Sequence, residues 1–285
     1  MEQIKQAIER AKASATSERL RPMTAPHDQS APTLTPAPQN RTEASESIAV
    51  SAGSVPLLGE MSLNWSHLEQ HRIVAHNVAD PRAKVFDSLR TQVLQVMDQK
   101  KWQFLAITSP TKGCGKTVTA INLALSIARQ PERSVLLVDL DLQKPAVVNY
   151  LGIRCQKGVV GILNGKTTLA EAVIRANADT CALKVLPAEA ATMWSSELVA
   201  SGNMSTMLQH IKRTFRSHTV IFDMPPLLQG DEVLATLPKL DCVLLVTAIG
   251  VSTLQEIKEC NRHLQSTEVI RLVLNKASGP TKRHY

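Results

Sequence analysis

The stretch of sequence that decides the fold is FLAITSPTKGCGKTV, residues 104–118. It begins with an apolar run typical of a buried strand, and an apolar run typical of a helix continues from its end to Ala128. Gly113 and Gly115 lie between the two, and without a Cβ they let the chain turn tightly. The N-terminus of the helix would direct unpaired backbone N–H groups at an anion. The order strand, glycine-bearing loop, helix therefore predicts a phosphate-binding loop.

The residues of this loop suit the phosphates of a nucleotide. Lys116 is expected against the β- and γ-phosphates, and the Thr117 hydroxyl on a Mg²⁺ ion. The match to the pattern G-x-x-x-x-G-K-[ST] is incomplete, because Pro110 stands where the first glycine is expected. Cys114 is interpreted as a small residue in a tight loop, with a redox switch as the alternative. The candidate nucleotide-binding residues of the loop are Gly113, Cys114, Gly115, Lys116, Thr117 and Val118.

Two further strands are expected to end in acids. The segment VLLVDLD, residues 135–141, places Asp139 and Asp141 after a continuous apolar run, which is typical of a central parallel strand. The segment VIFD, residues 220–223, ends in Asp223. Ligands of open α/β sheets bind at the carboxyl ends of the strands, so all three carboxylates are expected at one edge of the sheet. Solvated loop acids are the alternative.

The acids and the loop together predict a site for ATP and Mg²⁺. Asp231 is expected in a following loop, where it could sense the γ-phosphate. The candidate metal ligands are Thr117, Asp139, Asp141 and Asp223. The candidate catalytic residues are Lys116, Asp139, Asp141 and Asp223.

These motifs resemble those of the bacterial tyrosine kinases of polysaccharide export loci, which are related to the partition-type ATPases. The resemblance covers roughly residues 80 to 277, and its motifs are residues 86–91, 113–117, 138–141, 144–145, 196–198 and 222–226. It implies a P-loop NTPase fold and a protein-tyrosine autokinase that uses ATP and Mg²⁺. It also implies that Asn275 bonds the adenine edge and that Asp139 or Asp141 accepts the proton of the tyrosine hydroxyl. The implied role is in exopolysaccharide or capsule synthesis and export, through a membrane-bound chain-length or export protein.

The sequence departs from this family at three places. Where the family has the oligomerisation motif Glu-x-x-Arg-x-x-Arg, this chain has Lys84, Asp87 and Arg90, so self-association and oligomer size stay open. Gln143 stands where an arginine usually follows the Asp-x-Asp pair. The third departure concerns the phosphoacceptor, because the family's C-terminal tyrosine cluster is missing.

The chain has two tyrosines, Tyr150 and the terminal Tyr285, and the resemblance makes Tyr285 the candidate phosphoacceptor. A partition-type switch ATPase, which hydrolyses ATP without phosphorylating tyrosine, is the alternative function. Thr111 stands where such ATPases have their signature lysine. A non-catalytic adaptor that binds nucleotide is a third hypothesis.

Composition limits the remaining functions. The chain has 285 residues, 44% hydrophobic content and a net charge of +7. A basic surface attracts nucleic acid or anionic lipid, but 3% aromatic content offers no stacking platform, so there is no strong nucleic-acid signal. The five cysteines show no paired or metal-type spacing, which indicates a reducing cytosol. The longest apolar stretch, near residues 243–251, is shorter than the roughly 20 residues of a membrane span. The expected location is cytoplasmic, peripheral at the membrane through a partner.

The chain is expected to divide into four parts. They are a short amphipathic helix at 1–14, a disordered Ala/Ser/Thr/Pro-rich linker at 15–62, a P-loop domain at 63–277 and a flexible basic tail at 278–285. Within the domain, helices are expected at 82–98, 116–129, 145–151, 158–163, 168–176, 196–215 and 252–265. Strands are expected at 102–109, 134–140, 183–187, 219–223, 242–247 and 269–275. Strands that alternate with helices predict a mostly parallel, doubly wound sheet with helices on both faces.

Overall fold

The structure is a computed structural model, and it describes residues 59–178, 181–265 and 267–277. All of these residues belong to one compact unit, Val55–Ser278. The expected helix at 1–14, nearly all of the expected linker, and the tail with Tyr285 lie outside the described residues.

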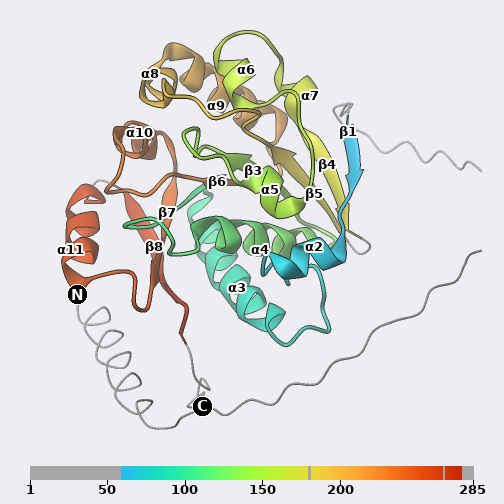
Figure 1. Cartoon of the computed structure of the whole chain (residues 1–285), viewed down its shortest axis with the longest axis vertical. Coiled ribbons are helices and arrows are strands. Elements are labelled where there is room, and N and C mark those ends of the chain that lie inside the picture. The colour runs from blue at the N-terminus through green and yellow to red at the C-terminus, as the bar shows by residue number, and fades with distance from the viewer. Residues whose placement is uncertain (1–58, 179–180, 266, 278–285) are drawn as a thin grey trace, which may run out of the picture. The chain divides into compact units, whose positions relative to one another are not determined.

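The centre of the fold is an eight-stranded sheet with the order β1-β4-β5-β3-β6-β2-β7-β8 (Figure 1). Only β4 and β5 pair antiparallel; every other pair of neighbours is parallel. The strands are β1 Gly59–Ser62, β2 Phe104–Thr108, β3 Ser134–Asp139, β4 Ile174–Ala178, β5 Cys181–Leu186, β6 His218–Asp223, β7 Cys242–Ala248 and β8 Glu268–Asn275. The prediction of a mostly parallel α/β sheet is confirmed.

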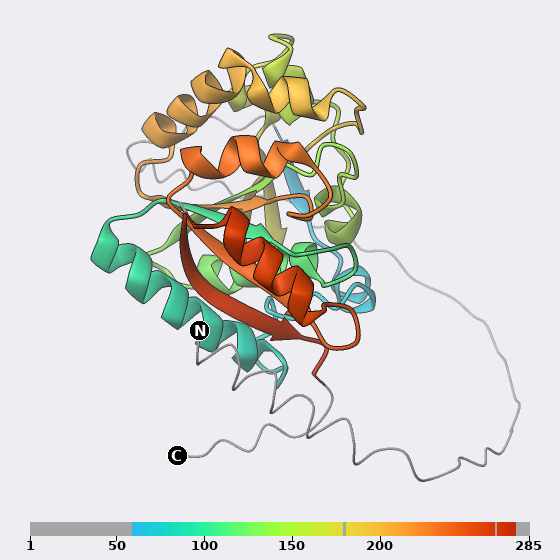
Figure 2. The same ribbon diagram turned by 90° about the vertical axis from the view of Figure 1, so that its left-hand side faces the viewer.

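Helices cover both faces of this sheet. Those of at least eight residues are α3 Ala83–Lys100, α4 Lys116–Ala128, α9 Gly202–Thr214 and α11 Leu254–His263. The shorter ones are α2 Trp65–Gln70, α5 Val147–Leu151, α6 Val159–Leu163, α7 Leu169–Ala172, α8 Ser195–Ala200, α10 Asp231–Thr236 and the 3₁₀ turn η1 Leu237–Lys239. In Figure 2 the teal α3 and the gold α9 lie on opposite sides of the sheet.

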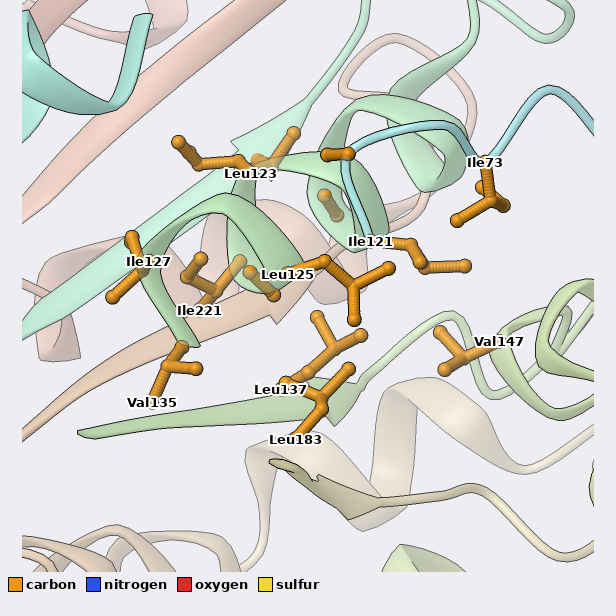
Figure 3. Close-up of a cluster of buried hydrophobic side chains, with 14 of the residues drawn as sticks. Ile73, Ile121, Leu123, Leu125, Ile127, Val135, Leu137, Val147, Leu183 and Ile221 are labelled. Atoms are coloured by element: carbon orange, nitrogen blue, oxygen red, sulfur yellow. The ribbon is translucent and has the colours of Figure 1, made fainter. Parts of the chain in front are cut away.

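Two hydrophobic cores result from this layering. Strand residues alternate between the faces, so Leu105 and Ile107 of β2 join one core while Phe104 and Ala106 join the other. Figure 3 shows the first core, where α4 side chains pack on those of β3 and β6. Strands covered on both faces need a continuous apolar sequence, which is why the central strands were readable from the sequence.

The structure corrects three of the expected elements. The segment 168–176 is not one helix: α7 ends at Ala172, and β4 then forms a hairpin with β5. The segment 196–215 is two helices, because Ser201 has an extended backbone (φ −68°, ψ 158°) that interrupts the helical hydrogen bonds. Asp231, expected in a loop, is the first residue of α10. Strand β1 and helix α2 were not expected at all.

Candidate nucleotide site

The glycine-bearing loop joins β2 to α4 and needs its glycines for different reasons. Gly115 has a φ of +91° and directly precedes Lys116, the first residue of α4. A Cβ on Gly115 would lie 2.3 Å from Nδ2 of Asn275, which donates a hydrogen bond to the Cys114 carbonyl at 2.9 Å. Gly113 has a φ of +79°, but a Cβ there would meet nothing within 4 Å. Gly115 is thus fixed by both backbone conformation and close packing, and Gly113 by conformation alone.

Lys116 and the acids predicted from the sequence meet at the end of this loop. Nζ of Lys116 lies 2.7 Å from Oδ2 of Asp141 and 3.7 Å from Oδ1 of Asp223. The Thr117 hydroxyl donates to Oδ2 of Asp223 at 2.6 Å. One cationic group, one hydroxyl and two carboxylates therefore share a single small volume.

Strand order explains why these groups converge. Strand β6 lies between β3 and β2, and the parallel register pairs Asp139 of β3 with Asp223 of β6. The loop that carries Lys116 begins at the end of β2, which pairs with β6 on the other side. Parallel strands present their carboxyl ends at one edge, so the three chain segments deliver their polar residues to the same place.

Asp139 holds its own loop instead of facing the lysine directly. Its Oδ1 accepts a hydrogen bond from the backbone N–H of Asp141 at 3.2 Å. Its Oδ2 accepts from the N–H groups of Ala146 and Val147, each at 3.0 Å. The carboxylate thereby fixes the loop that carries Asp141 and the start of α5.

Burial sets the electrostatics of the site. Burial, together with the facing Asp223 carboxylate, raises the pKa of Asp139 to about 8. Burial also raises the pKa of Asp223, although Lys116 and the Thr117 hydrogen bond oppose the change. Burial alone would lower the pKa of Lys116, but Asp223 and Asp141 outweigh it and raise that pKa. Lys116 therefore stays charged, and one of its two partners, Asp223, is a buried carboxylate that is itself costly to ionise.

A pocket of about 1210 Å³ opens beside these groups. Cys114 does not line it: this side chain is buried, and its Sγ lies 3.3 Å from the Ser252 hydroxyl, so it can meet a ligand only through its backbone. Asp139 and Asp223 lie beneath the lining, fully buried. The lining includes these residues expected to bind nucleotide or metal: Gly113, Gly115, Lys116, Thr117, Val118, Asp141 and Asn275.

The structure adds residues to the pocket that the sequence did not indicate. Glu232, near the start of α10, lines it together with Gln143, and Tyr150 of α5 lies in the same lining. The available signal for Glu232 was the pair of acids after Gly230, which is typical of a helix N-terminus. That signal gives the helix but not its position beside the pocket.

The donor set suits a magnesium ion that is bound together with phosphate. Among the described residues, no group of three or more His, Cys, Asp or Glu side chains could hold a metal ion. Oδ1 of Asp223 is nevertheless buried and accepts no hydrogen bond from the described part of the chain. Hydroxyl and carboxylate oxygens are ligands that Mg²⁺ prefers, and this ion takes few protein ligands when phosphates and water complete its shell. Thr117, Asp141 and Asp223 could hold it in this way.

Comparison with known proteins identifies the family. Residues 103–271, more than half of the chain, match the family described as AAA domain. The chain belongs to the AAA domain family. This AAA domain spans β2 to the first part of β8, and so it includes the whole glycine-bearing loop.

Relatives of this AAA domain confirm the resemblance to bacterial tyrosine kinases. EpsB of Ralstonia solanacearum is 32% identical over 212 residues, which are 72% of this chain but 27% of EpsB. The tyrosine-protein kinase CpsD of Streptococcus pneumoniae is 28% identical over 62% of this chain and 77% of CpsD. The kinase domain of Escherichia coli tyrosine kinase ETK has the same fold, with a TM-score of 0.64 at 22% identity over 83% of this chain and all of that domain. The chain thus spans less than a third of EpsB, but the whole of the ETK kinase domain. No helix in the described ranges is long and apolar enough to cross a bilayer.

Proposed function

We propose that this chain is an ATP-dependent protein-tyrosine autokinase that regulates exopolysaccharide or capsule synthesis or export through a membrane-bound partner. The observation that carries the proposal is the position of Lys116, whose Nζ lies between Asp141 and Asp223 beside the Thr117 hydroxyl. The likeness to CpsD, which is named a tyrosine-protein kinase, supports the choice of acceptor.

The residues act mainly by positioning and by neutralising charge, which phosphoryl transfer requires above all. In this proposal the backbone N–H groups at the start of α4 and Lys116 bind the β- and γ-phosphates. Thr117, Asp141 and Asp223 hold Mg²⁺, which neutralises phosphate charge when bound, and Asp139 keeps Asp141 in place through its backbone hydrogen bonds. Asp141, which lines the pocket, accepts the proton of the tyrosine hydroxyl. Asn275 contacts adenine through the N–H that it does not donate to Cys114.

The remaining parts of the proposal concern the chain outside the described residues. Tyr285 is the proposed acceptor, at the end of a basic tail that enters the site of a neighbouring copy. The segment 1–14, expected from the sequence to be an amphipathic helix, is the proposed docking element for the partner. Phosphate on Tyr285 would add nearly two negative charges beside Lys282 and Arg283, which would change how copies associate.

Labelled ATP followed by phosphopeptide mapping tests the proposal. The wild-type chain is expected to carry label on tyrosine, Lys116→Met to carry none, and Tyr285→Phe to lose the label at the C-terminal peptide. Phosphotyrosine that is absent from the wild-type chain, under conditions where it binds ATP, contradicts the kinase proposal.

A partition-type switch ATPase is the second candidate, and one observation favours it. Tyr150 is the single tyrosine within the described residues, so that part of the chain offers only one tyrosine as a phosphoacceptor. Phosphate release without phosphotyrosine, together with nucleotide-dependent binding to liposomes or DNA, would identify this function.

A further inference from the structure

A buried carboxylate at the edge of the pocket has no role in the mechanism above. Glu232 is 3% exposed, and its Oε1 accepts hydrogen bonds from the Ser195 hydroxyl and from Nε2 of Gln143, both at 2.5 Å. Burial alone would raise the pKa of Glu232, but the bonds from Ser195, from its own N–H and from Gln143 outweigh burial and lower that pKa. Glu232 is therefore an ionised, buried acceptor that holds the Gln143 amide.

Gln143 lies close to the phosphate-binding group. It follows Asp141 by two residues, and Oδ2 of Asp141 lies 2.7 Å from Nζ of Lys116. Gln143, Glu232 and Lys116 all line the same pocket. The loop between Asp141 and Gln143 is also held from the α8 side, because the Leu142 carbonyl accepts a hydrogen bond from the Thr192 N–H at 2.9 Å.

The chemistry of the amide fixes its orientation. A carboxylate only accepts hydrogen bonds, so the nitrogen of Gln143 must face Glu232, and the carbonyl oxygen is the group left to act as an acceptor. Within the described ranges that carbonyl oxygen receives no hydrogen bond. A glutamine carbonyl at a phosphoryl-transfer site can orient an attacking hydroxyl.

We infer that Gln143 orients the attacking hydroxyl group toward the γ-phosphate, and that Glu232 is the positioning residue that holds Gln143 for this task. The inference rests on the proposed ATP site. In the step concerned, the hydroxyl oxygen bonds to the γ-phosphorus, and the bond from that phosphorus to the β,γ-bridging oxygen breaks. ADP leaves with the bonding electrons, and the hydroxyl proton passes to Asp141. The hydroxyl belongs to tyrosine or to water, and separate assays distinguish the two.

Four variants of the full chain test the pair: Gln143→Ala, Glu232→Ala, both together, and Glu232→Gln. Phosphate release and phosphotyrosine formation are each measured against ATP concentration. Gln143→Ala and Glu232→Ala are each expected to lower kcat by roughly 10- to 100-fold, with KM for ATP changed by less than about threefold. The double variant should be no slower than the slower single variant, because the two residues act as one unit.

Glu232→Gln is the conservative rescue, since its side-chain oxygen can still accept from Ser195 and Gln143. It should keep kcat within about threefold of the wild type. Gln209→Ala, which removes an exposed glutamine of α9, is the matched control and should change nothing. A loss in the tyrosine assay alone, or in the phosphate assay alone, supports the inference and names the nucleophile.

Other outcomes overturn the inference. They are wild-type kcat in Gln143→Ala, or losses in the two single variants that multiply in the double variant. If Glu232→Ala does not fold by circular dichroism, Gln143→Ala and Glu232→Gln still decide, because Gln143 is exposed and Glu232→Gln keeps the hydrogen bonds. A wild-type chain that transfers phosphate to neither tyrosine nor water defeats the proposed function instead, which separates the two failures.

Discussion

At the residue scale, Gly115 is constrained in two ways, by its left-handed backbone conformation and by the side chain packed against it. Its φ of +91° suits glycine. The space where a Cβ would lie is filled by Asn275, the last residue of β8, which is far from Gly115 in the sequence. Gly115→Ala should therefore destabilise the chain in urea unfolding more than Gly113→Ala, whose Cβ would meet nothing within 4 Å. Both variants carry the left-handed penalty of about 1–2 kcal/mol.

The second substitution Asn275→Ala separates the two causes. Gly115→Ala combined with Asn275→Ala should recover the difference between the two alanine variants, because the clash is gone while the left-handed penalty remains. Additive losses in the double variant would show that packing against Asn275 does not matter.

His218 leads to a prediction of how the stability of the fold depends on pH. Nζ of Lys184 donates to Nε2 of His218 at 2.7 Å, so the folded chain needs the neutral imidazole. Burial and then Lys184 lower the pKa of His218 from its ordinary 6.5 to about 4. Between these two pH values His218 is protonated in the unfolded chain but neutral in the folded chain. The free energy of unfolding should therefore fall as pH drops from about 6.5 to about 4.

His218→Gln keeps an acceptor for Lys184 and removes the titration. Its free energy of unfolding, measured in urea at pH 7 and pH 5, should fall less between the two pH values than that of the wild type. Equal falls in the two proteins would contradict the assigned pKa.

At the scale of elements, Asp87 joins α3 to α4. Its Oδ1 accepts hydrogen bonds from Arg90, from the Ser126 hydroxyl and from Arg129. Asp87 occupies the middle of the segment that the sequence comparison placed at the oligomerisation motif of the resembled family, and Arg90 at its end donates a hydrogen bond to the Ser126 carbonyl of the same chain. The altered motif thus serves the packing of two helices of one domain.

Asp87→Ala should destabilise the fold by about 2–3 kcal/mol, because the Arg129 guanidinium, 9% exposed, loses its carboxylate. Asp98→Ala is the matched control on the same helix. Its partner Arg133 is 38% exposed, so the loss should stay below about 1 kcal/mol. Urea unfolding measures both, and equal losses would rule out a special role for Asp87.

At the scale of the whole molecule, both hydrophobic cores lie within the compact unit Val55–Ser278. A fragment of residues 55–278 should therefore unfold at the same urea concentration as the full chain and bind ATP in the presence of Mg²⁺. It should form no phosphotyrosine, because it lacks Tyr285, the proposed acceptor, and its remaining Tyr150 is not expected to accept phosphate. Urea unfolding measures the stability, calorimetry measures ATP binding, and an anti-phosphotyrosine blot detects phosphotyrosine. If the fragment does become labelled, and Tyr150→Phe abolishes that label, the acceptor is Tyr150 in the pocket lining and not Tyr285.

Much of the fold was predictable because its signals are local. The central strands are continuous apolar runs. Helix α4 follows a glycine-bearing loop whose characteristic residues, Gly113 to Thr117, are adjacent in the sequence. The failures have local causes too. The segment 168–176 combines a four-residue helix with the start of the five-residue strand β4, and neither element is long enough to show a clear period. The short elements β1, α2 and α10 give equally weak signals.

By itself the sequence determined which groups are available: a loop that suits phosphates, a lysine and threonine at its end, and acids that follow buried strands. Backbone geometry and hydrophobic periodicity fix these within a few residues. Only the tertiary structure decided their pairing, with Lys116 on Asp141 and Asp223, Asp139 on its own loop, Asn275 against Gly115, and Glu232 behind Gln143. Such pairings depend on the order β3-β6-β2-β7 in the sheet, and any of these apolar strands could have filled any central position, so the order is set by the packing of the whole domain.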